Sequence, residues 1–249
     1  MLYKALSCIK KLHLKSKSQI KNKSIVVNDI DLILSFAANP DFPWLISFPR
    51  TGSHWLRMIM ELYFEKPSLV RIFFYKNASS FTCIHRHDTY LKINGCRNVI
   101  YLYRNPVDTI FSQLSFKNED INSLQQITKW SSLYGKHLSK WLLEETFTKK
   151  KTVITYEEMI EDIYSSFRKI CGHFDISLDQ AKLSNALPKI SKEKLKKITE
   201  DEPRTVNVET SYDDLKSQFR KKHSSMIYDL ILEENKKLKS FFQFNNKRN

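Results

Sequence analysis

Glycine is scarce in this sequence: only four of the 249 residues are glycines, at positions 52, 95, 135 and 172. Their positions exclude the dinucleotide-binding pattern GxGxxG, and the Walker pattern GxxxxGK[ST] is also absent. The four cysteines form no CxxC pair and no spacing of a zinc site, so they indicate isolated thiols rather than a disulfide framework or a metal centre. Apolar runs are too short to span a membrane. A hydrophobic content of 41% excludes a disordered chain, and a soluble globular protein is expected.

Acidic residues are missing from the first 24 positions, and this shapes the charge of the chain. The formal charge is +14, of which residues 1–24 carry +7 and residues 216–249 carry +6, so that only +1 remains for the segment between them. We therefore expect a flexible basic tail over residues 1–24 and one domain over residues 25–249. The near-neutral centre argues against a nucleic-acid partner, although the basic tail could contact a membrane surface. No secretory signal is recognisable, so a cytoplasmic location is expected.

Short apolar strands alternate with amphipathic helices along the chain. This alternation predicts parallel βαβ units and therefore a three-layer α/β/α fold around a central parallel sheet. The expected elements are a helix over 29–38 capped by Asn28, a strand over 44–48, a helix over 53–65, an apolar run at 81–84, a strand over 98–103, helices over 107–116 and 124–147, a strand over 152–155, a helix over 157–174 and polar helices from 178 onward.

The segment from Phe48 to Trp55 joins a predicted strand to a predicted helix and is the strongest motif. A turn of this kind directs backbone N–H groups and a helix N-terminus towards a bound anion. Gly52 permits the sharp turn, and Arg50 adds a permanent positive charge with a forked set of donors. With the hydroxyls of Thr51 and Ser53, the segment predicts a phosphate site.

A second segment, from Tyr101 to Ser112, carries another anion-binding pattern. Arg104 follows a strand, Asn105 and Pro106 begin a helix, and Ser112 lies two turns along that helix. Ligands of open α/β sheets bind at the carboxyl ends of the strands. Arg104 alone could equally pair with Asp108, but two anion sites at one edge of the sheet favour a ligand with two separated phosphates.

These segments resemble the sulfotransferases that use 3′-phosphoadenosine-5′-phosphosulfate (PAPS). Residues 48–56 look like the family's phosphosulfate loop YPKSGTTW, residues 99–112 look like its 3′-phosphate strand and helix, and residues 155–158 resemble its YED segment. The resemblance implies a sulfotransferase with PAPS as the sulfuryl donor and no metal. The donor-binding residues that it implies are Arg50, Thr51, Gly52, Ser53, His54, Trp55, Arg104, Ser112 and Tyr156, with Trp55 stacked on adenine.

The resemblance also implies a histidine base, and two histidines compete for that role. The family's KTH segment aligns with His85, Arg86 and His87, which makes His87 the expected base and puts His85 where a lysine is usual. A histidine near its ordinary pKa can accept the proton of the acceptor group. The choice between the two histidines is left open, and Asp88 could orient either ring.

The C-terminal part departs from the family, because no counterpart of the glycine-rich RKGxxGDWKN loop follows Gly172. Arg204 is a candidate for closing the 3′-phosphate site. Lys216, Arg220 and Lys221 are alternatives, but a solvated helix face explains them more simply. The acceptor could be a small molecule, a glycan or a peptide. A phosphotransferase with a divergent loop and a basic nucleic-acid-binding protein are the competing functional hypotheses.

Overall fold

The computed structural model describes residues 24–95, 97–190 and 210–242. Its contacts divide the described residues into two compact units. The first contains residues 24–42, 54–85 and 181–190, and the second contains residues 43–53, 86–95, 97–180 and 210–242. Each unit is built from segments that are far apart in the sequence.

The first unit holds a short antiparallel pair of strands and several helices. The strands are β1 (Ile25–Val26) and β3 (Arg71–Ile72). The helix α2 (Ile30–Ala37) begins after Asp29, whose side chain accepts a hydrogen bond from the Leu32 N–H, so the expected cap at Asn28 was wrong by one residue. Most of α3 (Ser53–Phe64), α8 (Gln180–Ala186) and the 3₁₀ turn η2 (Leu187–Ile190) also belong to this unit.

Parallel strands form the sheet of the second unit. β5 (Arg97–Tyr103) lies between β2 (Trp44–Ser47) and β6 (Thr148–Thr155), with Leu45 opposite Ile100 and Ile100 opposite Thr152. The full strand order is β4-β2-β5-β6, where β4 (Ile84–Arg86) runs from the first unit into the second. The central strands are almost completely buried, as continuous apolar runs predict.

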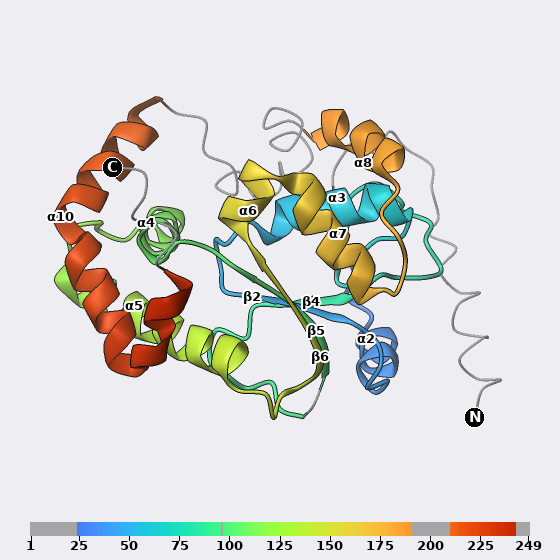
Figure 1. Cartoon of the computed structure of the whole chain (residues 1–249), viewed down its shortest axis with the longest axis horizontal. Helices are drawn as coiled ribbons and strands as arrows, with labels where there is room; N and C mark the ends of the chain where they lie inside the picture. Colours follow the sequence, from blue (N-terminus) through green and yellow to red (C-terminus); the bar gives the residue numbers. More distant parts are fainter. Residues whose placement is uncertain (1–23, 96, 191–209, 243–249) are drawn as a thin grey trace. The chain divides into compact units, whose positions relative to one another are not determined.

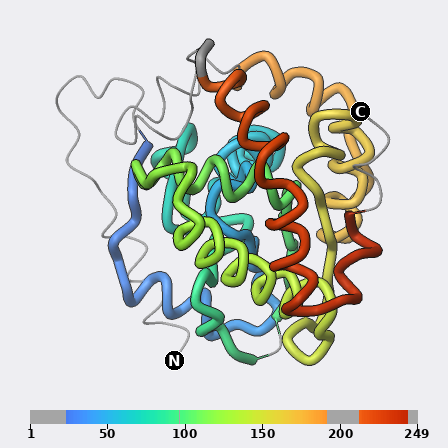
Figure 2. Tube along the Cα trace, turned by 90° about the vertical axis from the view of Figure 1, so that its left-hand side faces the viewer, coloured from blue at the N-terminus to red at the C-terminus, as the bar shows by residue number. Residues whose placement is uncertain are grey.

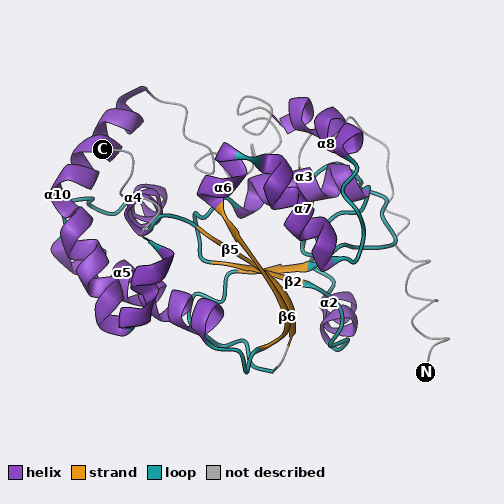
Figure 3. Cartoon of the chain, in the orientation of Figure 1, coloured by secondary structure: helices purple, strands orange, loops and turns teal. Residues whose placement is uncertain are grey.

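Helices of the second unit cover both faces of β5 and β6. In Figure 1, α6 (Tyr156–Glu161) and α7 (Ile163–His173) lie on one side, and α4 (Pro106–Lys117), α5 (Leu124–Leu138) and α10 (Thr210–Glu234) lie on the other. A π-helical turn, η1 (Ser139–Leu143), continues α5, and a 3₁₀ segment, η3 (Lys236–Phe241), follows α10. Figure 3 shows the strands between these helices. The predicted α/β fold with a central parallel sheet and a strand–loop–helix turn is confirmed.

The long helix α10 packs on α4 and α5, although about 100 residues separate them in the sequence. Figure 2 shows α10 running beside the two earlier helices. Phe219 is buried in this contact, where its ring lies 5.3 Å from that of Phe111. This packing brings the polar side chains of α10 to the start of α4. None of the helices in the described ranges is long and apolar enough to cross a membrane.

Candidate functional site

The loop after β2 turns sharply at two positions. Arg50 has φ of 70° and Gly52 has φ of 92°, both in the left-handed region that favours glycine. The Thr51 hydroxyl is buried and donates to the Phe48 carbonyl at 2.8 Å, so its hydrogen stabilises the loop itself. A Cβ atom on Gly52 would lie 2.7 Å from Cε2 of Tyr156, so the ring of Tyr156 packs directly on the loop. Glycine is therefore required at position 52 by both conformation and space.

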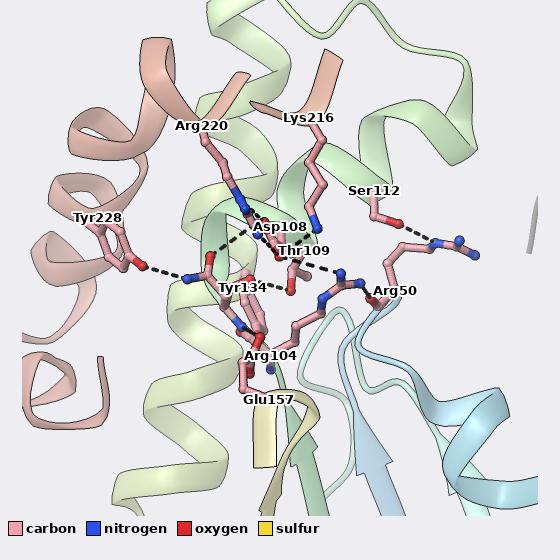
Figure 4. A network of polar contacts seen from close by, with 11 residues as sticks. Arg50, Arg104, Asp108, Thr109, Ser112, Tyr134, Glu157, Lys216, Arg220 and Tyr228 are labelled. Atoms are coloured by element: carbon pink, nitrogen blue, oxygen red, sulfur yellow. Dashed lines mark hydrogen bonds and ion pairs between the residues drawn. The ribbon is translucent and has the colours of Figure 1, made fainter. Parts of the chain in front are cut away.

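The side chain of Arg50 extends to the helix α4. Its Nε donates to the Ser112 hydroxyl at 3.1 Å, and its guanidinium carbon lies 4.7 Å from the centre of the Phe116 ring. The sequence predicts two separate anion sites, one with Arg50 and the other with Ser112. The structure brings them into direct contact (Figure 4).

Arg104 joins the two predicted sites through the backbone of the loop. Its Nη1 donates to the Arg50 carbonyl at 3.2 Å, and its guanidinium lies 4.2 Å from the centre of the Tyr156 ring. The hydroxyl of Tyr134 holds Arg104 in place, because it accepts from the Arg104 N–H at 3.0 Å and donates to the Arg104 carbonyl at 2.8 Å. The Nε of Arg104 is buried and has no hydrogen-bond partner among the residues that the structure describes. Such a donor needs an acceptor, which a phosphate oxygen would supply.

Asp108 gathers three cations next to this group (Figure 4). Arg220 binds its two carboxylate oxygens at 2.7 Å each, Lys216 Nζ lies 2.9 Å from Oδ2, and Arg104 Nη2 lies 3.6 Å from Oδ2. Burial alone would raise the pKa of Asp108, but the hydrogen bond from Arg220 and the charges of Arg104 and Lys216 lower it below its usual value. Arg104 therefore does pair with Asp108, which the sequence offered as the alternative to ligand binding, and the carboxylate stays ionised.

Lys216 and Arg220 are not simply a solvated helix face, which was the preferred interpretation of their sequence. They are four residues apart, so they lie on one face of α10, and both reach Asp108. A second contact fixes the same helix, because the Asn105 side chain donates to the Tyr228 hydroxyl at 2.9 Å. The i, i+4 spacing was visible in the sequence, but the carboxylate that they share was not.

The two candidate histidines lie in different units. His85 belongs to the first unit, is only 7% exposed, and has Nδ1 3.4 Å from Nη1 of Arg57. His87 is half-buried in the second unit, where Nδ1 lies 3.2 Å from both the hydroxyl and the carbonyl of Ser47, the last residue of β2. A carbonyl can only accept, so a neutral His87 carries its hydrogen on Nδ1 and Nε2 becomes the basic nitrogen.

The backbone of His87 is held by a third histidine that sequence analysis missed. Nε2 of His137 donates to the His87 carbonyl at 2.8 Å, and the Tyr101 hydroxyl lies 2.9 Å from Nδ1 of His137. Burial lowers the pKa of His137 to about 3, so this ring is neutral and acts as a fixed hydrogen-bond bridge.

Asp88 does not have the orienting role considered for it. Its Oδ2 accepts from Lys140 Nζ at 2.9 Å and from Trp141 Nε1 at 3.1 Å, while Oδ1 accepts from the Ile93 N–H at 2.9 Å. Both oxygens therefore stabilise the chain that follows β4. Ser47, by contrast, does contact the ring of His87 and helps to orient it.

The remaining predicted residues lie around the start of α3 or outside the described residues. Ser53 is buried at the first position of α3 in the second unit. His54 and Trp55 belong to the first unit, where the ring of His54 packs edge-on against Phe73 at 5.8 Å. Arg204 lies outside the residues that the structure describes.

The fold places the basic residues Arg50 and Arg104 directly after two neighbouring parallel strands, an arrangement that suits an anionic ligand. The family model described as "Sulfotransferase domain" matches residues 84–243, well over half of the chain. The chain therefore belongs to the sulfotransferase domain family. The match includes Arg104, Ser112, both candidate histidines and Tyr156, whereas the loop that contains Arg50 precedes it.

The fold is also similar to that of a solved sulfotransferase. A mouse sulfotransferase, SULT7A1, complexed with PAP, superposes with a TM-score of 0.50 at 18% sequence identity, over 77% of this chain and 87% of that chain. A retinol dehydratase in complex with androsterone and the inactive cofactor PAP has a TM-score of 0.47 at 11% identity, over 79% of this chain and 81% of that chain. No curated protein sequence matches the chain.

Proposed function

We propose that the protein transfers a sulfuryl group from PAPS to a hydroxyl or amine of an acceptor. The observation that carries this proposal is the contact of Arg50 with Ser112 and Arg104, which unites the two predicted phosphate sites. The buried, unpartnered Nε of Arg104 fits a phosphate oxygen, and the family match supports sulfuryl transfer. The mouse sulfotransferase of similar fold is complexed with PAP, the desulfated form of this donor.

Arg50 stabilises the negative charge that builds on the donor during transfer. Its guanidinium cannot lose its proton near neutral pH, so it acts as a fixed charge and not as an acid. A bond forms between the acceptor atom and sulfur while the bond from sulfur to the bridging oxygen breaks, and 3′,5′-adenosine bisphosphate leaves. Arg104 and Ser112 hold the 3′-phosphate.

His87 accepts the proton that the acceptor group loses. Ser47 fixes the ring through Nδ1, so Nε2 is the nitrogen that takes the proton. Ser47 also directly precedes the loop of Arg50, so the base is attached to the same strand end as the fixed charge. His85 is less suited to this role, because its ring is buried against Arg57. The acceptor is a small molecule, a glycan or a peptide.

The donor assignment is tested by ligand-induced thermal stabilisation of the full chain. We expect 3′,5′-adenosine bisphosphate to raise the melting temperature, and ATP with Mg²⁺ or duplex DNA to leave it unchanged. A shift with ATP and Mg²⁺ alone would instead indicate a phosphotransferase, and salt-sensitive stabilisation by DNA alone would indicate a nucleic-acid-binding protein.

The base is tested with two matched variants, His87→Ala and His85→Ala, in a screen of PAPS-dependent sulfation over phenols, alcohols, glycans and peptides. We expect His87→Ala to lose about 10²- to 10⁴-fold in turnover and to keep its affinity for the bisphosphate. Full turnover by His87→Ala, together with a loss in His85→Ala at unchanged bisphosphate affinity, would assign the base to His85.

A further inference from the structure

The cations around Asp108 leave an excess of positive charge at the start of α4. Arg104, Lys216 and Arg220 together carry three positive charges and share one ionised carboxylate, which leaves two. Among the residues that the structure describes, Glu157 is a second acidic residue that acts on this group, and its Oε1 accepts from the Asn105 N–H at 3.0 Å. Even when Glu157 is counted as ionised, one positive charge remains. The cluster can therefore accept an anion.

On the basis of the proposed function, we propose that Lys216 and Arg220 of α10 complete the 3′-phosphate subsite and select donors that carry this phosphate. A terminal phosphate monoester carries between one and a half and two negative charges near pH 7, so its charge is opposite in sign to the one or two positive charges that remain on the cluster. Arg104 connects the cluster to the subsite, because the same guanidinium contacts Asp108 and the carbonyl of Arg50.

The cluster has donors to spare for a phosphate. An ammonium group has three hydrogens, and among the described residues Asp108 Oδ2 is the one partner of Lys216 Nζ. Nε of Arg104 is buried and also lacks an acceptor within the described part of the chain. A phosphate group has three terminal oxygens to satisfy these donors.

Access to the cluster is open on the side of α10. The Arg220 side chain is 52% exposed, whereas those of Lys216 and Arg104 are 17% and 14% exposed. The bidentate pair with Asp108 holds Arg220 in one orientation, and the hydrogen bond from Asn105 to Tyr228 holds its helix against the start of α4. Lys216 and Arg220 are therefore oriented before a ligand arrives, which favours binding.

The test compares two nucleotides that differ only in the 3′-phosphate. Calorimetry on the full chain gives the dissociation constants of 3′,5′-adenosine bisphosphate and of adenosine 5′-monophosphate, and their ratio measures what the 3′-phosphate contributes. We expect the unmodified protein to prefer the bisphosphate, and Lys216→Gln and Arg220→Gln each to reduce the ratio about tenfold or more, the size expected for one charged hydrogen bond. Lys221→Gln removes an exposed charge from the same helix and should change the ratio less than twofold.

The affinity for the monophosphate separates a lost subsite from a damaged fold. It should stay constant in all three variants, because this nucleotide does not reach the cluster. If the ratio of dissociation constants in Lys216→Gln and Arg220→Gln equals that in Lys221→Gln, the inference is overturned and the proposed function stays intact. An unmodified protein that binds both nucleotides equally would also overturn it, whereas one that binds neither would overturn the proposed function as well.

Discussion

Replacing Gly52 with alanine should damage both the fold and the phosphate loop, and Gly95 provides a matched control. Both glycines are in the left-handed region, with φ of 92° and 86°. They differ in space: a Cβ on Gly52 would overlap the Tyr156 ring, with Cε2 at 2.7 Å, whereas the nearest atom to a Cβ on Gly95 is Nη2 of Arg97 at 3.9 Å. The pair therefore separates backbone strain from steric overlap.

The two contributions can be estimated from general values. An alanine held in the left-handed region costs about 1–2 kcal/mol, and this is the whole effect expected for Gly95→Ala. Overlap with a packed ring adds about 1–3 kcal/mol, so Gly52→Ala should cost roughly 2–5 kcal/mol. For a chain of this size each kcal/mol lowers the melting temperature by about 2–4 °C.

Thermal unfolding of Gly52→Ala, Gly95→Ala and the double variant Gly52→Ala with Tyr156→Ala measures these contributions. Without the Tyr156 ring, the Gly52→Ala substitution should cost only the backbone strain, because the steric overlap is gone. The double variant should therefore be only about 1–2 kcal/mol less stable than Tyr156→Ala alone. Affinity for the bisphosphate should fall in Gly52→Ala and remain unchanged in Gly95→Ala. Equal destabilisation by the two glycine substitutions, or no recovery in the double variant, would refute the close packing of Tyr156 on the loop.

Two further predictions concern acid stability. The pKa of Asp108 is lowered in the folded state, so its carboxylate stabilises the fold fully above the unfolded pKa of about 3.9, and this stabilisation is lost as the pH falls through the folded pKa. Asp108→Asn should lower the free energy of unfolding by about 3 kcal/mol at pH 7. In chemical unfolding at decreasing pH, the variant should not show the further loss of stability that protonation of Asp108 causes in the unmodified protein. The pKa of His137 is about 3 when folded and about 6.5 when unfolded, so protonation of the unfolded chain removes roughly 2 kcal/mol by pH 5. His137→Gln should flatten the decline between pH 6.5 and 4, and an unchanged slope would contradict the buried neutral ring.

The strand-to-helix turns could be predicted from the sequence because their signals are local. A buried strand, a turn residue and an amphipathic helix follow one another within about 20 positions in both phosphate segments. Asn105 caps α4 with its side chain, and Pro106 is the first residue of that helix, as the sequence indicated. Short-range hydrogen bonds and the pattern of apolar residues determine these features, so no partner from elsewhere in the chain was needed.

Element boundaries were less accurate where tertiary contacts override the local pattern. The strand β6 begins at Thr148, four residues earlier than expected, and includes three lysines; Lys151 reaches the Leu142 carbonyl with its Nζ at 3.1 Å. A long lysine side chain can cover apolar surface while its charge finds a polar partner. The helix expected over 157–174 is interrupted at Asp162, whose side chain caps α7 by accepting from the Ser165 N–H.

The cation cluster could not be predicted from the sequence for a different reason. Asp108 and Arg220 are separated by 112 positions, and nothing in the sequence around either one identifies the other. A row of basic residues on a helix is usually a solvated face, and that interpretation holds for the exposed Lys221. Lys216 and Arg220 differ from Lys221 because the packing of α10 on α4 brings their side chains to Asp108.

The conformation of Arg50 depends on contacts between the two segments that the sequence predicts to bind phosphate. A residue other than glycine at φ of 70° is strained by about 1–2 kcal/mol and persists only where its surroundings hold it. Two of the hydrogen bonds that hold Arg50 come from the segment after β5: Arg104 donates to the Arg50 carbonyl, and Ser112 accepts from the Arg50 side chain. Any ligand group that recruits Arg104 or Ser112 therefore acts on the backbone and the side chain of Arg50 as well, so the two segments respond to a ligand together.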